Sequence, residues 1–256
     1  MTADELTITV LPGTTKSGAK ERFDRVDIRP GDTISIVGPT GSGKTALIND
    51  IEVFAQGDTV TGRRILVNGE LPPESFVRDP SQKPIAMITQ HTKCLADLSV
   101  RQFLDMHVRA RKNAVPQIAE EAVALANRFT GEKVAGDDRM SSLSGGQTRS
   151  LLIADSVLIS GAPILLLDEI ENAGIYKDEV IKYLRGVNKA VLFVTHDPYI
   201  SLLSDRRIVM RGGEVTQILV PGDSEKKALG IVAEADALLS GLRERIRSGE
   251  TLKEAV

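Results

Sequence analysis

Short apolar runs alternate with amphipathic segments along most of the chain. Strand-like runs occupy residues 6–10, 23–28, 33–37, 65–67, 84–89, 164–167 and 190–194, and a last pair of strands falls within 207–220. Helical spacing extends over residues 44–54 and 177–184, and from the glycines at 145 and 146 to about residue 159. Strands that alternate with helices in this way predict an α/β sheet.

The pattern becomes mainly helical between residues 91 and 160. Residues 99–127 are rich in Ala, Arg, Glu and Leu at helical spacing, and an interruption at 113–116 predicts two helices. The α/β fold therefore comes with a β-rich N-terminal part and a helical subdomain inserted at about 91–160. We expect residues 1–220 to form one domain and residues 221–256 to form an extension.

That extension contains a separate amphipathic helix over residues 224–248. Its apolar positions step by four and three residues: Ala228, Val232, Ala235, Leu239, Leu242 and Ile246. Such a stripe can pack against a partner helix, but about three heptads are too few to specify a coiled coil. We expect the helix to lie against its own domain, with a partner helix as the alternative.

Composition narrows the class of protein. The 256 residues carry 32 Lys and Arg against 35 Asp and Glu, so no global field favours nucleic acid or an anionic membrane. The longest purely apolar runs, 122–126 and 190–194, are far shorter than a membrane span, and the N-terminus lacks the pattern of a signal peptide. A single cysteine, Cys94, agrees with a reducing compartment. We expect a cytoplasmic protein that does not bind nucleic acid.

The segment after the predicted strand at 33–37 fits the phosphate-loop pattern G-x-x-x-x-G-K-[ST] at every position: Gly38, Pro39, Thr40, Gly41, Ser42, Gly43, Lys44 and Thr45. Glycines let successive N–H groups point at a phosphate, and the start of the following helix adds a partial positive charge. Lys44 supplies a cation for the β- and γ-phosphates, while the Thr45 hydroxyl is a hard ligand for Mg²⁺. The loop predicts a nucleotide site.

A second set of residues ends the apolar strand at 164–167. Asp168 and Glu169 emerge at the carboxyl edge of the sheet, where open α/β sheets bind their ligands. Asp168 can hold Mg²⁺, and Glu169 is placed to polarise an attacking water as a general base.

A third motif, Leu143-Ser144-Gly145-Gly146-Gln147, combines a hydroxyl, two glycines and a helix N-terminus, which are the components of an anion site. With this motif the sequence resembles the ATP-binding-cassette (ABC) ATPases over roughly residues 1–220. The resemblance implies a P-loop NTPase core sheet, ATP and Mg²⁺ as ligands, and a head-to-tail homodimer. In that dimer the residues from Ser144 to Gln147 cover the nucleotide on the other protomer's phosphate loop.

The resemblance gives two more residues a role. Gln90 stands where the family has a glutamine that contacts Mg²⁺ and the lytic water, and His196 stands where the family has a histidine that contacts the γ-phosphate. Two departures are also visible. Ile175 replaces the aspartate of the D-loop, and the usual adenine-stacking aromatic is missing from residues 11–20, which leaves Phe23 as a weak candidate or a buried strand residue.

The resemblance favours the nucleotide-binding subunit of a transporter, at the inner face of the cell membrane, with a separate membrane subunit seated on the Gln90 segment and the inserted helices. The basic cluster of Arg101, Arg109, Arg111 and Lys112 lies on those helices, although such a cluster is more often a solvated face. The altered D-loop leaves an alternative open, a soluble ABC ATPase that remodels or activates another protein. Glu169 and His196 disfavour a third class, a nucleotide-regulated binding module without turnover.

Overall fold

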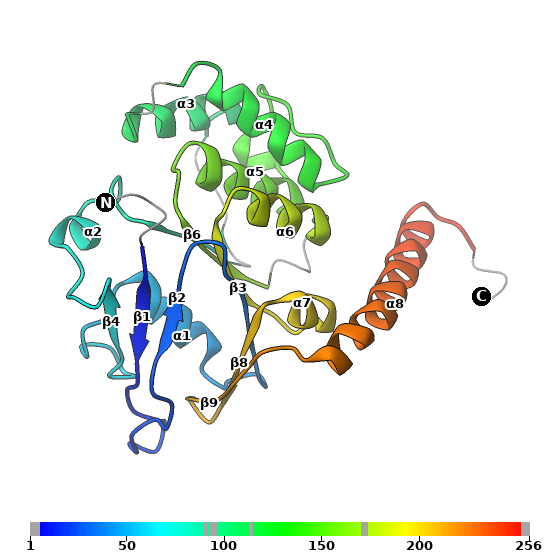
Figure 1. Cartoon of the computed structure of the whole chain (residues 1–256). Coiled ribbons are helices and arrows are strands. Elements are labelled where there is room, and N and C mark those ends of the chain that lie inside the picture. Colours follow the sequence, from blue (N-terminus) through cyan, green and yellow to red (C-terminus); the bar gives the residue numbers. More distant parts are fainter. Residues whose placement is uncertain (1–5, 90–91, 93–96, 113–114, 170–173, 252–256) are drawn as a thin grey trace.

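Two sheets form the framework of the chain in the computed structural model, which describes residues 6–89, 92, 97–112, 115–169 and 174–251 (Figure 1). The smaller sheet is antiparallel with the order β2-β1-β4: β1 (Ile8–Leu11), β2 (Val26–Ile28) and β4 (Arg64–Val67). The larger sheet has the order β5-β6-β7-β3-β8-β9: β3 (Thr33–Val37), β5 (Ile85–Ile88), β6 (Ile164–Asp168), β7 (Ala190–Val194), β8 (Arg206–Arg211) and β9 (Glu214–Leu219). Only the β8–β9 pair of this sheet is antiparallel. The predicted α/β fold is confirmed.

The helices are α1 (Lys44–Glu52), α2 (Glu74–Arg78), α3 (Val100–Ala110), α4 (Ile118–Phe129), α5 (Gly145–Leu158), α6 (Lys177–Gly186), α7 (Pro198–Leu203) and α8 (Asp223–Arg247), with a 3₁₀ turn at Met140–Ser142. The sequence pattern missed α2 and α7, which are too short to show helical periodicity. In Figure 1, α3 to α6 gather on one side of the larger sheet, away from the smaller sheet and α1. The domain limits at 91–160 and 220 stay predictions.

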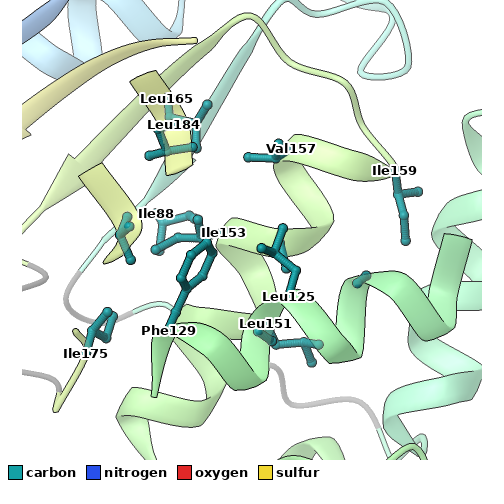
Figure 2. Close-up of a cluster of buried hydrophobic side chains, with 14 of the residues drawn as sticks. Ile88, Leu125, Phe129, Leu151, Ile153, Val157, Ile159, Leu165, Ile175 and Leu184 are labelled. Carbon is teal, nitrogen blue, oxygen red and sulfur yellow. The ribbon is translucent and has the colours of Figure 1, made fainter. Parts of the chain in front are cut away.

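The central strands β6 and β7 of the larger sheet are buried on both faces, which explains the continuous apolar run of β6. Leu165 and Leu167 face a core built with α3 to α6, whereas Ile164 and Leu166 face a second core shared with α1 and the smaller sheet. Figure 2 shows the first of these cores, in which Phe129 of α4 lies among aliphatic side chains.

A buried charge cluster connects the start of β4 in the smaller sheet with α1 and the β8–β9 turn. The Arg63 guanidinium donates two hydrogen bonds to the Glu21 carboxylate, at 2.9 and 2.7 Å, and one to Asp50 at 3.1 Å. It also donates to the Gly213 carbonyl at 3.0 Å, and its side chain is fully buried. Arg63 therefore joins the strand β4, the helix α1 and the β8–β9 turn.

We expect Arg63→Ala to lower the free energy of unfolding by about 3–5 kcal/mol, because it leaves two buried carboxylates without their cation. Denaturant titration of the purified protein measures this loss. The matched control is Arg25→Ala, which removes the ion pair of a largely exposed arginine with Asp27 and should cost about 0–1 kcal/mol. Equal losses for the two variants would contradict the account.

Helix α8 is attached to the domain only along its first half. Lys177 forms an ion pair with Asp236 at 3.0 Å, Arg207 pairs with Glu225, and α8 contacts α7. Beyond these contacts α8 projects away from the rest of the chain (Figure 1). None of its residues with a described side chain is buried. The expectation that this helix covers its own domain is therefore wrong for its second half.

Candidate functional site

Three neighbouring parallel strands bring the candidate residues to one edge of the larger sheet. Strand β7 lies between β3 and β6, and Val194 at its end is in register with both Ile36 and Asp168. Strands are about 4.8 Å apart, so β3 and β6 end within about 10 Å of each other across the edge. The phosphate loop and Glu169 directly follow β3 and β6, and His196 lies two residues after the end of β7.

The phosphate loop joins β3 to α1 through three glycines with positive φ, Gly38, Gly41 and Gly43. The ammonium group of Lys44 folds back over the loop and donates to the carbonyls of Gly38 at 2.8 Å and Pro39 at 3.2 Å. Only glycine fits at position 38, since a Cβ there would stand 2.2 Å from the Met210 carbonyl oxygen. Strand β8 thus closes one side of the loop.

A second lysine, which the sequence pattern did not reveal, contacts the same loop. Lys16 donates from its ammonium group to the Gly41 carbonyl at 2.7 Å, and its backbone lies against the β8–β9 turn. In that turn the Gly213 N–H donates to the Ser42 carbonyl at 3.0 Å. Lys16 lies in the segment where the resemblance leads one to expect an adenine-stacking aromatic.

Glu169 and His196 face each other beside the loop. Glu169 has a left-handed backbone with φ 49°, which is uncommon for a side chain larger than glycine, and its N–H donates to the Val194 carbonyl at 2.9 Å. The distance from His196 Nε2 to Glu169 Oε1 is 3.6 Å. Both side chains are partly exposed, as groups that meet a substrate must be.

The segment after His196 is held from two sides. Asp197 caps α7 by accepting from the backbone N–H groups of Tyr199 at 2.8 Å and Ile200 at 3.3 Å. Its other oxygen accepts from the Lys177 ammonium at 2.5 Å. Burial alone lowers the pKa of Lys177, but the hydrogen bonds to Asp197 and Asp236 outweigh it and raise that pKa above its ordinary value. Lys177 therefore stays charged at neutral pH and links α6, the His196 loop and α8.

The LSGGQ segment begins α5 and lies apart from α1 and its phosphate loop (Figure 1). Ser144 is the N-cap, with its hydroxyl accepting from the Gln147 N–H at 3.3 Å, while the Gln147 side chain accepts from the Ser144 N–H at 2.8 Å. Gly145 is exposed, and the guanidinium of the buried Arg149 lies beneath it. The start of α5 thus presents backbone N–H groups with a cation behind them.

Three further predictions concern Gln90, the D-loop position Ile175, and Phe23. Gln90 and residues 170–173 lie outside the described residues. Ile175, at the position of the D-loop aspartate, is buried against Phe129 (Figure 2). Phe23 is half-buried and packs against the core shared by α1 and the smaller sheet, but it lies before β2, so the alternative of a buried strand residue is wrong.

Two comparisons decide the family. The sequence profile of the ABC transporter family matches residues 24–172. An ABC transporter ATP-binding protein of Methanocaldococcus jannaschii is 48% identical over 96% of this chain and 94% of its own length. The chain belongs to the ABC transporter family. It is accordingly an ATP-binding protein and an ATPase, as the resemblance predicted.

More distant matches agree with the fold of this ABC protein. A dimeric ATP-binding cassette bound to ADP and phosphate superposes with a TM-score of 0.64 over 85% of the chain and 99% of its own, at 22% identity. The spermidine/putrescine import ATP-binding protein PotA of Nitratidesulfovibrio vulgaris is 31% identical over 78% of the chain, which spans 54% of PotA. Across the described ranges, none of the helices has the length and apolarity of a membrane-spanning segment.

The contact between the β8–β9 turn and Lys16 allows a test of whether Lys16 at the phosphate loop contributes to ATP binding. In Gly213→Ala the new methyl group would stand 2.8 Å from Lys16 Cγ and 3.2 Å from its backbone nitrogen, which displaces Lys16 from Gly41. We expect about tenfold weaker ATP binding, equivalent to about 1.4 kcal/mol, by equilibrium titration.

Gly212→Ala is the matched control for this variant. Gly212 also has a positive φ, so alanine introduces comparable backbone strain, but a Cβ there meets nothing within 4 Å. Equal ATP affinities for the two variants would refute the role given to this contact.

Proposed function

We propose that two copies of this chain close head to tail on two Mg-ATP molecules and hydrolyse them to drive a separate membrane transport subunit. One observation carries the proposal. The phosphate loop and the Glu169–His196 pair share one sheet edge, whereas the LSGGQ segment lies elsewhere on the same chain. Each chain therefore contributes its phosphate loop, Glu169 and His196 to one nucleotide site of the dimer and its LSGGQ segment to the other.

The phosphates of ATP bind along the loop between Gly38 and Thr45. The Lys44 ammonium, which contacts carbonyl oxygens of the loop, turns to the β- and γ-phosphates when they are present. The Ser42 hydroxyl is buried and has no hydrogen-bond partner in the described part of the chain, so a phosphate oxygen would satisfy it. Lys16 adds a second cation at the same loop.

Thr45 and Asp168 are the residues that would hold Mg²⁺. Thr45 is exposed in the first turn of α1, and Asp168 ends β6 at the same edge. Hydroxyl and carboxylate oxygens are hard ligands, and Mg²⁺ in such sites is bound by one or two protein groups together with phosphates and water. When bound, the ion neutralises charge on the phosphate oxygens. Gln90 is assigned to the same ion by resemblance.

Hydrolysis uses the Glu169 carboxylate as the base for the attacking water. The water oxygen forms a bond to the γ-phosphorus, the bond to the bridging oxygen of ADP breaks, and the water proton passes to Glu169. The left-handed backbone and the hydrogen bond to Val194 fix where this carboxylate points. His196, 3.6 Å away, contacts the γ-phosphate and orients it for attack.

The second copy completes each site. The backbone at the start of α5, from Ser144 through the exposed Gly145 to Gly146, with Gln147 completing the capping box, binds the γ-phosphate held by the other chain's loop. ATP then favours the closed dimer because only the dimer makes both sets of contacts. The dimeric cassette with ADP and phosphate supports this arrangement.

Transport is supported by the names of the relatives, which include ATP-binding proteins for import of spermidine or putrescine and of sulfate or thiosulfate. The membrane subunit would seat on the inserted helices, where Arg101, Arg109 and Lys112 of the α3 region are exposed and Arg111 is half-buried. This assignment places the chain in the cytoplasm, at the inner face of the membrane.

The base is tested with Glu169→Gln, which keeps the shape of the side chain but cannot accept a proton. We expect loss of steady-state ATP hydrolysis by at least about 100-fold and an ATP-dependent shift from monomer to dimer in size-exclusion chromatography. Glu70→Gln, an exposed site on the smaller-sheet side, should leave hydrolysis unchanged. A Glu169→Gln variant with normal turnover would overturn the mechanism.

The partner is tested by affinity purification of the Glu169→Gln variant with ATP from the native cells, after mild detergent extraction. We expect a multi-span membrane protein to co-purify in stoichiometric amount. The charge reversals Arg109→Glu and Lys112→Glu on the α3 face should lose it, since that face would then repel the partner. Recovery of soluble proteins alone would favour the alternative, an ABC ATPase that acts on a soluble client.

A further inference from the structure

An exposed apolar stripe runs along α8 from Ile231 in its attached first half to Ile246 in its free second half. Ile231, Leu238, Leu239 and Ile246 are 73, 49, 51 and 60% exposed, which is unusual for four large aliphatic side chains on one helix. Ala235 and Leu242 fall between them at steps of three or four residues, so all six lie on one face. Most half-buried residues in the first half of the helix lie toward an adjacent side: Glu225, Leu229, Val232, Ala233 and Asp236.

We propose that this stripe pairs with the same stripe of a second copy, antiparallel, about a two-fold axis between Leu238 and Leu239. A two-fold contact places residue i against j and j against i. About this axis Leu238 meets Leu239, Ala235 meets Leu242, and Ile231 meets Ile246. Every apolar position of the stripe then has an apolar partner.

The charges beside the stripe fit the same arrangement. Glu234 and Arg245 border the stripe on one side, and the antiparallel contact brings Glu234 of one copy near Arg245 of the other, which within its own chain pairs with Glu250 at 2.7 Å. A membrane surface would favour basic residues along both borders, which the acidic Glu234 opposes.

The stripe from Ile231 to Ile246 is about 24 Å long, so the contact is smaller than a standard interface of about 800 Å² per partner. Such a contact suits a tether. It holds two copies together without nucleotide and makes the ATP-driven closure of the proposed dimer intramolecular. The pairing itself does not rest on the proposed closure, because it forms between α8 helices in the absence of ATP.

Crosslinking of the full chain without nucleotide tests the geometry. Cys94 is the single cysteine, so variants are made in a Cys94→Ser background and treated with a short bismaleimide. Leu239→Cys should give covalent dimers. Ile246→Cys alone should not, because the two copies of this residue would be about 22 Å apart along the helices. A mixture of Ile231→Cys and Ile246→Cys chains should crosslink to each other.

Crosslinking at Ile246→Cys alone, or none at Leu239→Cys, would overturn the antiparallel contact. Sedimentation without nucleotide gives a second readout. Leu239→Glu should lose the dimer seen with the unmodified chain. Ala237→Glu should keep it, because Ala237 is exposed on the side of α8 opposite the stripe. An unmodified chain that stays monomeric at every concentration would also overturn the proposal. ATP hydrolysis by Leu239→Glu should persist but become dependent on protein concentration, which separates this proposal from the ATPase mechanism.

Discussion

The parallel pairing of β7 with both β3 and β6 is the constraint on which the site depends. Because Val194 is level with Ile36 on one side and Asp168 on the other, three chain segments far apart in sequence leave the sheet at the same height. The phosphate loop, the Glu169 carboxylate and the His196 ring then need no further adjustment to meet. A shift of one residue in either pairing would reverse which side chains face each core and would separate these groups.

The local parts of this arrangement could be predicted from the sequence, because periodicity and glycine spacing are local properties. Strands, the longer helices, the phosphate loop and the acidic strand end were all visible in this way. The contacts of Lys16 with Gly41 and of Arg63 with Glu21, Asp50 and Gly213 were not, since they join residues up to 150 positions apart. A lysine or arginine in a loop has no local pattern that distinguishes such a partner from solvent.

Helix α8 shows the opposite case, in which a local pattern was visible but its partner was not. The same apolar steps describe a helix that covers its own domain and one that leaves the domain. Only the ion pair of Lys177 with Asp236 and the exposure of Leu239 and Ile246 separate the two. Since Lys177 also pairs with Asp197 next to His196, the middle of α8 is connected to the nucleotide site through Lys177.

The central claim is that each nucleotide is held by the phosphate loop of one copy and the LSGGQ segment of the other. The most direct measurement is ATP hydrolysis by a mixture of two inactive variants. Lys44→Ala removes the loop cation, and Ser144→Asp keeps a helix cap but sets a carboxylate against the phosphates. An equal mixture contains about one intact site in four, all in mixed dimers, so activity should return to about a quarter of that of the unmodified chain. A mixture as inactive as its components would contradict the account.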